Sequence, residues 1–274
     1  MNKHFNNSPL PFQGQKRRFI KKFKAALNDF PNDTTYVDLF GGSGLLAHTV
    51  KQKYPKAKVI WNDYDNFKSR IDSIHETNLL LAKLRRLLFD SPRKARMSDK
   101  AKNNVLEVIK QHEVLFGYVD YITISSCFLF SAKYATNYSE LEASGFYNKI
   151  KLTDYDATGY LKGVERVQKD YKELYETSKS ATTVFLVDPP YLSTDTSSYN
   201  SKNYWKLKDY LDVLNVLNDS KYFYFTSNKS QIVELCDWIE TRASTGNPFE
   251  GSTMTTTSGS VSHSSTYTDI MLFK

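Results

Sequence analysis

Apolar positions in the first quarter of the chain follow first a helical and then a strand-like spacing. Residues 17–30 place apolar side chains at helical intervals and predict a basic helix, whereas residues 34–40 form a short apolar run that predicts a strand. A helix over 45–53 and a second strand over 58–62 should follow. This order is typical of a parallel sheet whose strands are joined by crossover helices.

The last third of the chain repeats this alternation. The β-branched, apolar run 182–187 predicts a central strand, because strands buried on both faces are almost continuously apolar. We expect a helix, a strand, a helix and a short final strand over residues 205–217, 222–226, 230–241 and 267–273. The Ser-, Thr- and Gly-rich stretch 244–268 is compatible with either a hairpin or an irregular loop.

The middle of the chain has a different pattern. Residues 67–112 are helical in spacing with a break near Ser91-Pro92, residues 116–160 have no firm period, and residues 164–178 are again helical in spacing. We therefore predict an α/β protein in which a mainly helical region is inserted into the sheet domain. The predicted boundaries place residues 1–66 and 179–274 in the sheet domain and residues 67–178 in the insertion.

The chain has a net charge of +7 and a pI of about 9.1, and most of the excess lies in one segment. Between Lys83 and Glu113 there are nine Lys or Arg residues and four Asp or Glu residues. Such a segment can contact the phosphates of a nucleic acid, or it can be a solvated helical face.

Composition argues against a membrane protein. The sequence has no run of 18 apolar residues, and its first residues lack the apolar stretch of a signal peptide. Cys127 and Cys236 lie in apolar surroundings without the spacing of metal ligands. We expect reduced core cysteines, no structural metal, no membrane partner and a cytoplasmic location.

Residues 38–44 have a composition that suits a ligand. Three of the last four residues are glycine, and a ligand that approaches the backbone at the end of a parallel strand needs residues without a Cβ atom. Asp63 ends the second strand 19 residues after Gly44, where a carboxylate can accept both hydroxyls of a ribose. Together they indicate an adenosine-containing ligand. A plain glycine turn, and an Asx turn or helix cap within residues 62–65, are the alternatives, and Asp65 competes with Asp63 for the ribose-binding role.

Asp188, Pro189, Pro190 and Tyr191 follow directly on the predicted central strand. The two prolines fix an extended turn and lack N–H donors, so the carbonyl oxygens there stay available. A carboxylate, a carbonyl and an aromatic ring then meet at one strand end. This set fits an exocyclic amine: Asp188 and the Pro189 carbonyl would accept its two N–H bonds while Tyr191 stacks on the ring. The amine could then attack a donor methyl group directly.

With these motifs the chain resembles the Dam-type DNA adenine-N6 methyltransferases of bacteria and phages. The resemblance covers residues 9–66 and 182–235, with the cofactor motif before the variable region and the catalytic motif after it. The matching residues are Phe12, Gly14 and Lys16 near the amino terminus, Asp38, Phe40, Gly42 and Gly44 in the glycine turn, Asp63, and the tetrapeptide Asp188 to Tyr191.

The resemblance implies a Rossmann-like sheet that binds S-adenosylmethionine and releases S-adenosylhomocysteine, with a target-recognition domain as the insertion. It implies that the substrate is an adenine flipped out of double-stranded DNA. A cognate restriction endonuclease is a candidate partner. The implied catalytic residues are Asp188, Pro189, Pro190 and Tyr191. The implied cofactor-binding residues are Phe12, Lys16, Asp38, Phe40, Gly42, Gly44, Asp63 and Asp188.

The resemblance is weaker in the middle. Family members that recognise GATC carry an Arg/Asn-rich stretch and a Phe-Asn-x-Pro-like segment, which residues 128–149 match only loosely, so GATC does not follow. The candidate DNA-contacting residues are Lys133, Asn137, Asn148 and Lys149 in this stretch, and Tyr199 and Trp205 after the tetrapeptide.

Three rival functions share parts of these motifs. A cytosine-N4 methyltransferase would more often have serine in place of Asp188, and a protein-glutamine or RNA methyltransferase would more often have asparagine there. A DNA-binding regulator without catalysis has no need for the glycine turn, Asp63 and the tetrapeptide together. Adenine in DNA is therefore the favoured substrate.

Overall fold

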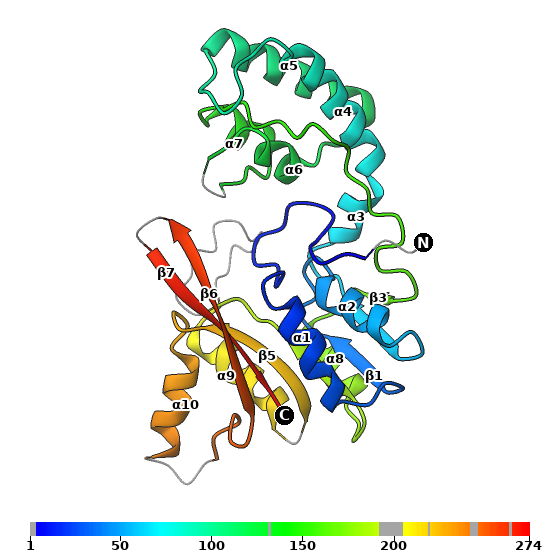
Figure 1. Cartoon of the computed structure of the whole chain (residues 1–274), viewed down its shortest axis with the longest axis vertical. Coiled ribbons are helices and arrows are strands. Elements are labelled where there is room, and N and C mark those ends of the chain that lie inside the picture. The colour runs from blue at the N-terminus through cyan, green and yellow to red at the C-terminus, as the bar shows by residue number, and fades with distance from the viewer. Residues whose placement is uncertain (1–3, 131–132, 192–204, 219, 242–245, 263–264) are drawn as a thin grey trace. The chain divides into compact units, whose positions relative to one another are not determined.

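The computed structural model describes residues 4–130, 133–191, 205–218, 220–241, 246–262 and 265–274. The chain forms two compact units (Figure 1). The sheet unit comprises Met1–Asn7, Gln15–Asp65 and Tyr160–Lys274, and the helical unit comprises Ser8–Gly14 and Asn66–Gly159. The chain therefore crosses between the units at four places.

The sheet unit contains a seven-stranded sheet in the order β3-β2-β1-β4-β5-β7-β6. The pairs from β3 to β5 are parallel, while β7 is antiparallel to both β5 and β6. The strands are β1 Thr35–Asp38, β2 Lys58–Asn62, β3 Glu165–Val167, β4 Val184–Val187, β5 Lys221–Ser227, β6 Thr253–Ser262 and β7 Ser265–Phe273. The α/β fold with parallel central strands, predicted from the sequence, is confirmed.

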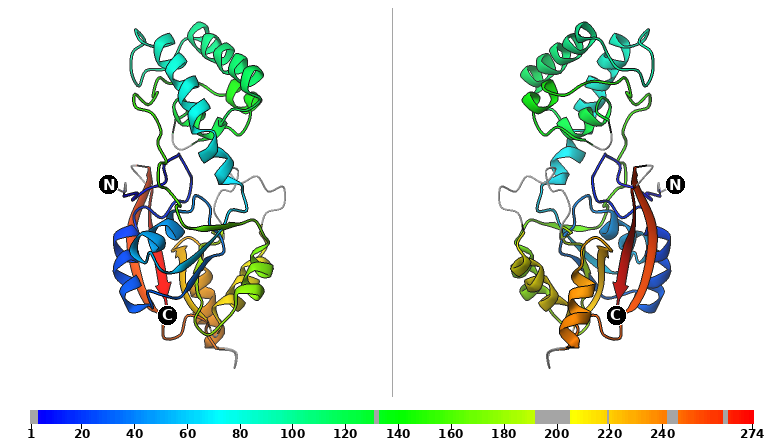
Figure 2. Two further views of the ribbon diagram at one scale, coloured as in Figure 1. Left: turned by 90° about the vertical axis from the view of Figure 1, so that its right-hand side faces the viewer. Right: turned by 90° about the vertical axis from the view of Figure 1, so that its left-hand side faces the viewer.

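Helices cover both faces of this sheet (Figure 2). Helices α1 Ile20–Ala26 and α2 Leu45–Lys53 lie on one face, where Phe23 packs against Phe223 and Phe225 of β5. Helices α8 Tyr171–Ser178, α9 Leu207–Leu217 and α10 Ile232–Glu240 bury the opposite face in one hydrophobic cluster. Successive side chains of β1 and β4 alternate between the two faces of the sheet. Because helices cover both faces, both strands are buried on both sides.

The position of β1 determines where a ligand can bind. The strand lies between β2 and β4 in the sheet, and its last residue, Asp38, is in register with Trp61 on one side and Leu186 on the other. The chain leaves β1 towards β2 and later returns to β4 on the other side. Such a switch in strand order opens a crevice at the carboxyl ends of the two strands.

The helical unit is formed mainly by α3 Phe67–Asp72, α4 Ile74–Leu87, α5 Asp99–Phe116, α6 Tyr121–Ser126 and α7 Tyr138–Glu142. These helices enclose a hydrophobic core of their own. Arg70 Nε lies 3.0 and 3.1 Å from the two carboxylate oxygens of buried Asp120, which also caps α6 by accepting from Thr123 N. A buried charge of this kind is stable only when it is paired.

The predicted insertion boundaries are corrected by the structure. The region predicted as 67–178 ends at Gly159, and residues 8–14 lie in the helical unit although they were assigned to the sheet domain. The helix predicted over 164–178 begins only at Tyr171, because Glu165–Val167 pairs with β2 as strand β3. The stretch 244–268 contributes to a hairpin, β6–β7.

Neither the helices nor the cysteines of the described residues contradict the sequence-based expectations. Among the described residues no helix is long and apolar enough to span a membrane. Cys127 and Cys236 are free thiols, and both are buried, as expected for core residues. Cys236 packs in the hydrophobic cluster beneath α10, and Cys127 packs in the core of the helical unit.

Candidate functional site

Two carboxylates meet at the carboxyl ends of β1 and β4. Asp38 is the last residue of β1, and Asp188 directly follows β4. Lys16, which lies before α1 and is only 8% exposed, places Nζ 2.6 Å from Asp188 Oδ2 and 5.1 Å from the centre of the Tyr191 ring. The structure thus brings together four residues that the sequence nominated for one site.

The Asp38 carboxylate is the most strongly perturbed of these groups. Burial, followed by the nearby charge of Asp188, raises the pKa of Asp38 to about 8. The Ala47 and Phe40 amides and the Lys16 ammonium act in the opposite direction, but neither carboxylate oxygen makes a hydrogen bond of good geometry within the described residues. An unsatisfied buried carboxylate favours a ligand that donates hydrogen bonds or carries positive charge.

The second carboxylate is closer to its ionised form. Burial raises the pKa of Asp188 to about 6, while its ion pair with Lys16 limits the rise. Asp269 of β7 also raises the pKa of Asp188. Asp269 is itself buried, and desolvation raises its pKa as well. Around Lys16 the site therefore has more carboxylates than ammonium groups, which again favours a cationic ligand.

The glycine turn after β1 has two separate reasons for its composition. Gly42 and Gly44 have φ values of +46° and +76°, which favour glycine. Gly41 is required by packing: a Cβ atom there would lie 2.2 Å from Cδ1 of Trp61 and 2.8 Å from the backbone oxygen of Asn62. All three glycines were expected to serve a ligand, whereas in the structure Gly41 accommodates β2.

Asp63 follows β2 and is held by a neighbour from β3. Arg166 Nε donates to Asp63 Oδ2 at 2.7 Å, and the Asp63 side chain is fully closed to solvent. Asn62 fixes this corner further by donating to the carbonyls of Leu39 and Lys169 at 3.0 and 2.9 Å. Binding of ribose hydroxyls by Asp63 stays a prediction, and it requires Arg166 to share or release the carboxylate.

Phe40 and Trp205 belong to a group of aromatic rings at the same edge of the sheet. The Phe40 ring lies 4.9 Å from Tyr171 and 5.6 Å from Trp205, and Trp205 also contacts Tyr210 at 5.2 Å. Trp205 is half-buried in this group. The structure thus gives Trp205 a packing role, while its predicted contact with DNA is untested. Tyr199 lies outside the described residues.

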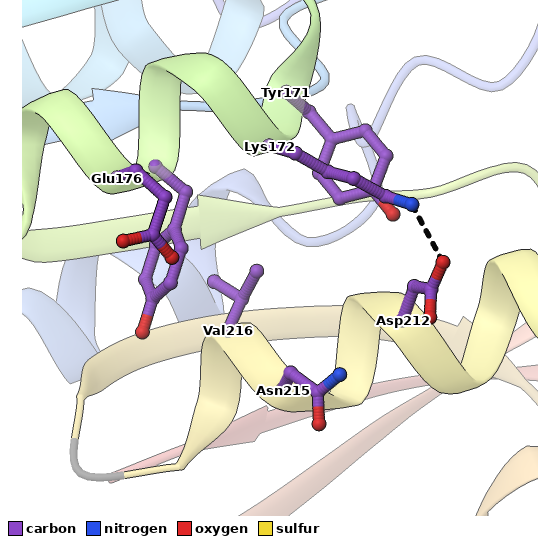
Figure 3. A pocket seen from close by; sticks show the side chains of 7 residues that line it. Tyr171, Lys172, Glu176, Asp212, Asn215 and Val216 are labelled. Atoms are coloured by element: carbon purple, nitrogen blue, oxygen red, sulfur yellow. Dashed lines mark hydrogen bonds and ion pairs between the residues drawn. The ribbon is translucent and has the colours of Figure 1, made fainter.

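A hollow between α8 and α9 is separate from the two carboxylates (Figure 3). It is lined by Tyr171, Lys172, Tyr175, Glu176, Asp212, Asn215 and Val216. Lys172 and Asp212 form an ion pair of 2.5 Å across it, and Glu176 is its third charged residue. Lys172 and Glu176 are exposed, so solvent screens the charges of the hollow, whereas Asp38 is buried.

The remaining predicted residues lie in the helical unit. Phe12 packs edge to face on Phe67 at 5.5 Å. Asn137 caps α7 by accepting from Glu140 N, and Lys149 donates to the Leu129 carbonyl. Lys133 is exposed.

Asn148 is the predicted DNA-contacting residue that the structure argues against. Its side chain is 1% exposed, and its amide donates to the Ser91 carbonyl at 3.0 Å. Its backbone connects residues 94 and 95 to the rest of the unit. A base or phosphate cannot reach a side chain enclosed in this way, so we correct that assignment to a structural role.

Two residues near the carboxylates were missed by the sequence analysis. Arg166 was placed in a predicted helix, because the stretch Val164 to Val167 is too short and lacks the alternation that would identify it as a strand. Asp269 was hidden in the tail, although it is the only acidic residue after Glu250. An isolated acid in an apolar strand is a useful signal for a site residue.

The chain is similar to known methyltransferase sequences. Residues 12–243 match the model of a family described as D12 class N6 adenine-specific DNA methyltransferase. A Haemophilus influenzae protein whose name reads "Putative methyltransferase" is 34% identical to the chain over 284 residues. That alignment covers 99% of the chain and 93% of the relative, so it includes both units.

We predict that Gly41→Ala destabilises the sheet unit, because the added methyl group overlaps the Trp61 ring and the β2 backbone. Overpacking of this kind costs about 1–3 kcal/mol. Chemical denaturation followed by tryptophan fluorescence measures the loss. Gly145→Ala is the matched control, since a Cβ there meets nothing within 4 Å. Equal stabilities of the two variants would contradict the packing role of Gly41.

Proposed function

The chain belongs to the D12 class N6 adenine-specific DNA methyltransferase family, and from this we propose the complete reaction. The protein transfers a methyl group from S-adenosylmethionine to the N6 amino group of an adenine that is flipped out of double-stranded DNA. The single observation that carries the proposal is the convergence of Asp38, Asp188 and Lys16 at the carboxyl ends of β1 and β4. We place the reaction in the cytoplasm.

The residues around Asp38 suit S-adenosylmethionine. This cofactor has a positively charged sulfonium and an ammonium group, and the crevice has an excess of carboxylate. The Asp38 oxygens would gain the hydrogen-bond donors that they lack, and a bound cation would lower the pKa of Asp38. The turn through Gly42 and Gly44 would let the ligand approach the backbone. When bound, the cofactor supplies an electrophilic methyl group.

Asp188 and Pro189 would orient the amine. They accept the two N–H bonds of N6, and Tyr191 stacks on the adenine ring, so the nitrogen lone pair is directed outwards. N6 forms the bond to the methyl carbon as the carbon–sulfur bond breaks, and that electron pair stays on sulfur. N6 then releases one proton. The pKa of Asp188 is about 6, so its carboxylate is ionised at neutral pH and can accept that proton.

The helical unit would bind the DNA backbone. Of the nine basic residues between Lys83 and Glu113, seven are exposed: Lys83, Arg86, Arg93, Lys94, Arg96, Lys100 and Lys110. Arg85 and Lys102 are less exposed: Arg85 donates to Lys151, Thr153 and Asp154, and Lys102 donates to Glu142. Arg93 also donates to the Ile150 carbonyl, at 2.6 Å, but it stays exposed. Exposure therefore separates the phosphate-contacting candidates from the structural residues.

Within the exposed group, Arg93, Lys94 and Arg96 are the strongest candidates. They lie on the connection between α4 and α5, which is held against residues 146–148 by backbone hydrogen bonds from Lys94 to Asn148 and from Met97 to Phe146. None of the three pairs with a carboxylate in the part of the chain that the structure describes. Their charge is therefore available to phosphates.

We predict that Asp188→Asn lowers methyl transfer at least 100-fold, because asparagine cannot accept both the orienting hydrogen bond and the released proton. Transfer of labelled methyl groups from S-adenosylmethionine to duplex DNA measures the rate. Nucleoside analysis of the product distinguishes N6-methyladenine from the alternative, N4-methylcytosine. DNA binding should change less than threefold, because contacts to phosphates, which Asp188 does not make in this mechanism, dominate the affinity for DNA.

The matched control is Asp212→Asn, which removes a carboxylate from the hollow between α8 and α9. It should keep the wild-type rate. Full activity of Asp188→Asn would rule out the proposed mechanism, and loss of activity in Asp212→Asn would place the reaction in the hollow.

We predict that the rate falls as the pH drops through about 6, where Asp188 takes up a proton. Lys16 holds the pKa of Asp188 down, so Lys16→Met should move this acid limb to higher pH by about one pH unit. Single-turnover rates between pH 5 and 8 give the pH at which the rate is half-maximal, and this midpoint does not depend on the maximal rate of each variant. Lys21→Met is the control, because Lys21 is an exposed residue of α1. An unmoved limb in Lys16→Met would contradict the coupling.

We predict that the triple change Arg93, Lys94 and Arg96 to Ala weakens DNA binding and lowers the slope of log K against log salt by about 0.9 for each lost phosphate contact. Titrations of duplex DNA at several salt concentrations measure both quantities. The control changes the same number of charges in the sheet unit, at exposed Lys56, Lys179 and Lys221. An unchanged slope in the first triple variant would identify those residues as a solvated face.

A further inference from the structure

Residues 160–166, which return the chain from the helical unit to the sheet unit, contact the proposed cofactor site at several points. Tyr160 is the first residue after the helical unit, and Arg166 lies in β3. The Tyr160 hydroxyl donates to the carbonyl of Ser43 at 2.8 Å, within the glycine turn. Arg166 donates to Asp63 at 2.7 Å. We call residues 160–166 the return segment.

The bond from Tyr160 to Ser43 is fully enclosed. Tyr160 is 8% exposed, and its ring packs against His48 at 4.5 Å and Phe5 at 5.0 Å. Burial raises the pKa of Tyr160 far above its ordinary value, and nearby Asp38 adds to the effect. The hydroxyl therefore keeps its proton and remains a donor at neutral pH.

Leu161, the next residue, also contacts the glycine turn. The Leu161 amide donates to Nδ1 of His48 at 3.0 Å, and burial lowers the pKa of His48 to about 4, so the imidazole stays neutral and can accept. The Leu161 side chain lies against Gly44, where an added Cβ would be 2.9 Å from its Cδ atoms. The carbonyl and the last glycine of the turn are thus both fixed by the return segment.

Leu161 adopts an unusual backbone conformation to make these contacts. Its φ is +57°, a left-handed value that is unfavourable for a residue with a branched side chain. Such a conformation persists only where the surrounding contacts impose it. Here the hydrogen bonds of Tyr160 and of the Leu161 amide do so, on either side of the Leu161 Cα atom.

We propose that the return segment is a positioning element for the cofactor-binding turn, with Tyr160 as its main positioning residue. This inference rests on the proposed function, because it assigns a task to residues around a site for S-adenosylmethionine. Tyr160 does not touch the reacting atoms. Its hydroxyl holds the Ser43 carbonyl, and so sets the backbone path of the turn before the ligand binds.

The test is Tyr160→Phe in the full chain, which removes one hydroxyl and keeps the ring. We expect the dissociation constant and the KM for S-adenosylmethionine to rise roughly three- to tenfold, the effect of one buried hydrogen bond. At saturating cofactor, kcat and the affinity for DNA should stay within twofold of wild type. Calorimetric titration with S-adenosylmethionine and steady-state kinetics measure these quantities.

Tyr36→Phe is the matched control. It removes a hydroxyl that donates to a carbonyl at 2.7 Å, that of Pro31, at the opposite end of β1. Both variants should lose similar thermal stability, but Tyr36→Phe should bind the cofactor as wild type does. Should Tyr160→Phe fail to fold, Leu161→Asn is the second variant. Asparagine tolerates the left-handed conformation, and the substitution removes the leucine side chain that lies against Gly44. Leu161→Asn should therefore also weaken cofactor binding.

The outcomes separate the inference from the proposed function. A wild-type protein that does not bind S-adenosylmethionine would overturn the proposed function. A wild-type protein that binds it, together with a Tyr160→Phe variant of unchanged cofactor affinity, would overturn only the positioning role. Equal weakening in Tyr160→Phe and Tyr36→Phe would also overturn it, because the effect would then follow from stability alone.

Discussion

The site depends on one electrostatic constraint: two acidic side chains at adjacent strand ends are buried together, with the ammonium group of Lys16 beside them. Parallel pairing of β1 and β4 brings Asp38 and Asp188 to the same edge, and Lys16 forms an ion pair with Asp188. Raised pKa values for both acids mean that folding favours their protonated forms, so stability falls as the pH rises from the ordinary aspartate pKa of 3.8 to about 6 for Asp188 and to about 8 for Asp38. A protein keeps such a cost where a cationic ligand can relieve it.

Packing around the sheet holds this charged group in place. The layers on both faces are fixed by large aromatic contacts, such as Phe23 on β5 and Phe40 on Tyr171, and the strand ends have little freedom to separate. Asn62 adds hydrogen bonds that join the end of β1 to the segment after β3. The rigid parts of the sheet unit thus surround the glycine turn, whose own conformation depends on Gly42 and Gly44. Preorganisation of this kind reduces the entropy lost when a ligand binds.

Sequence periodicity predicted the central strands and their helices well, because those segments are long, apolar and uninterrupted. The expected strands over 58–62 and 182–187 correspond to β2 and β4. The three-residue strand β3 was missed, since so short an element has no period, and it exists because the edge of β2 is available to pair with it. The motif residues Lys16 and Asp188 were found from their types and order. Arg166 and Asp269 were not, because their roles depend on pairing between distant segments.

The place of the insertion explains why chain crossings and site residues coincide. The helical unit occupies the connection between β2 and β3, so the chain leaves the sheet unit two residues after Asp63 and re-enters it at Tyr160. From Tyr160 the chain passes along α2, contacting His48 and then approaching Lys51 at Gly163, before β3 returns to the carboxyl edge beside Asp63. A parallel crossover must carry the chain from the carboxyl end of β2 back to the start of β3, and here the chain does so alongside α2. Topology therefore brings the return segment to the proposed cofactor-binding turn. The Tyr160 hydroxyl then fixes the segment to that turn through its hydrogen bond to the Ser43 carbonyl.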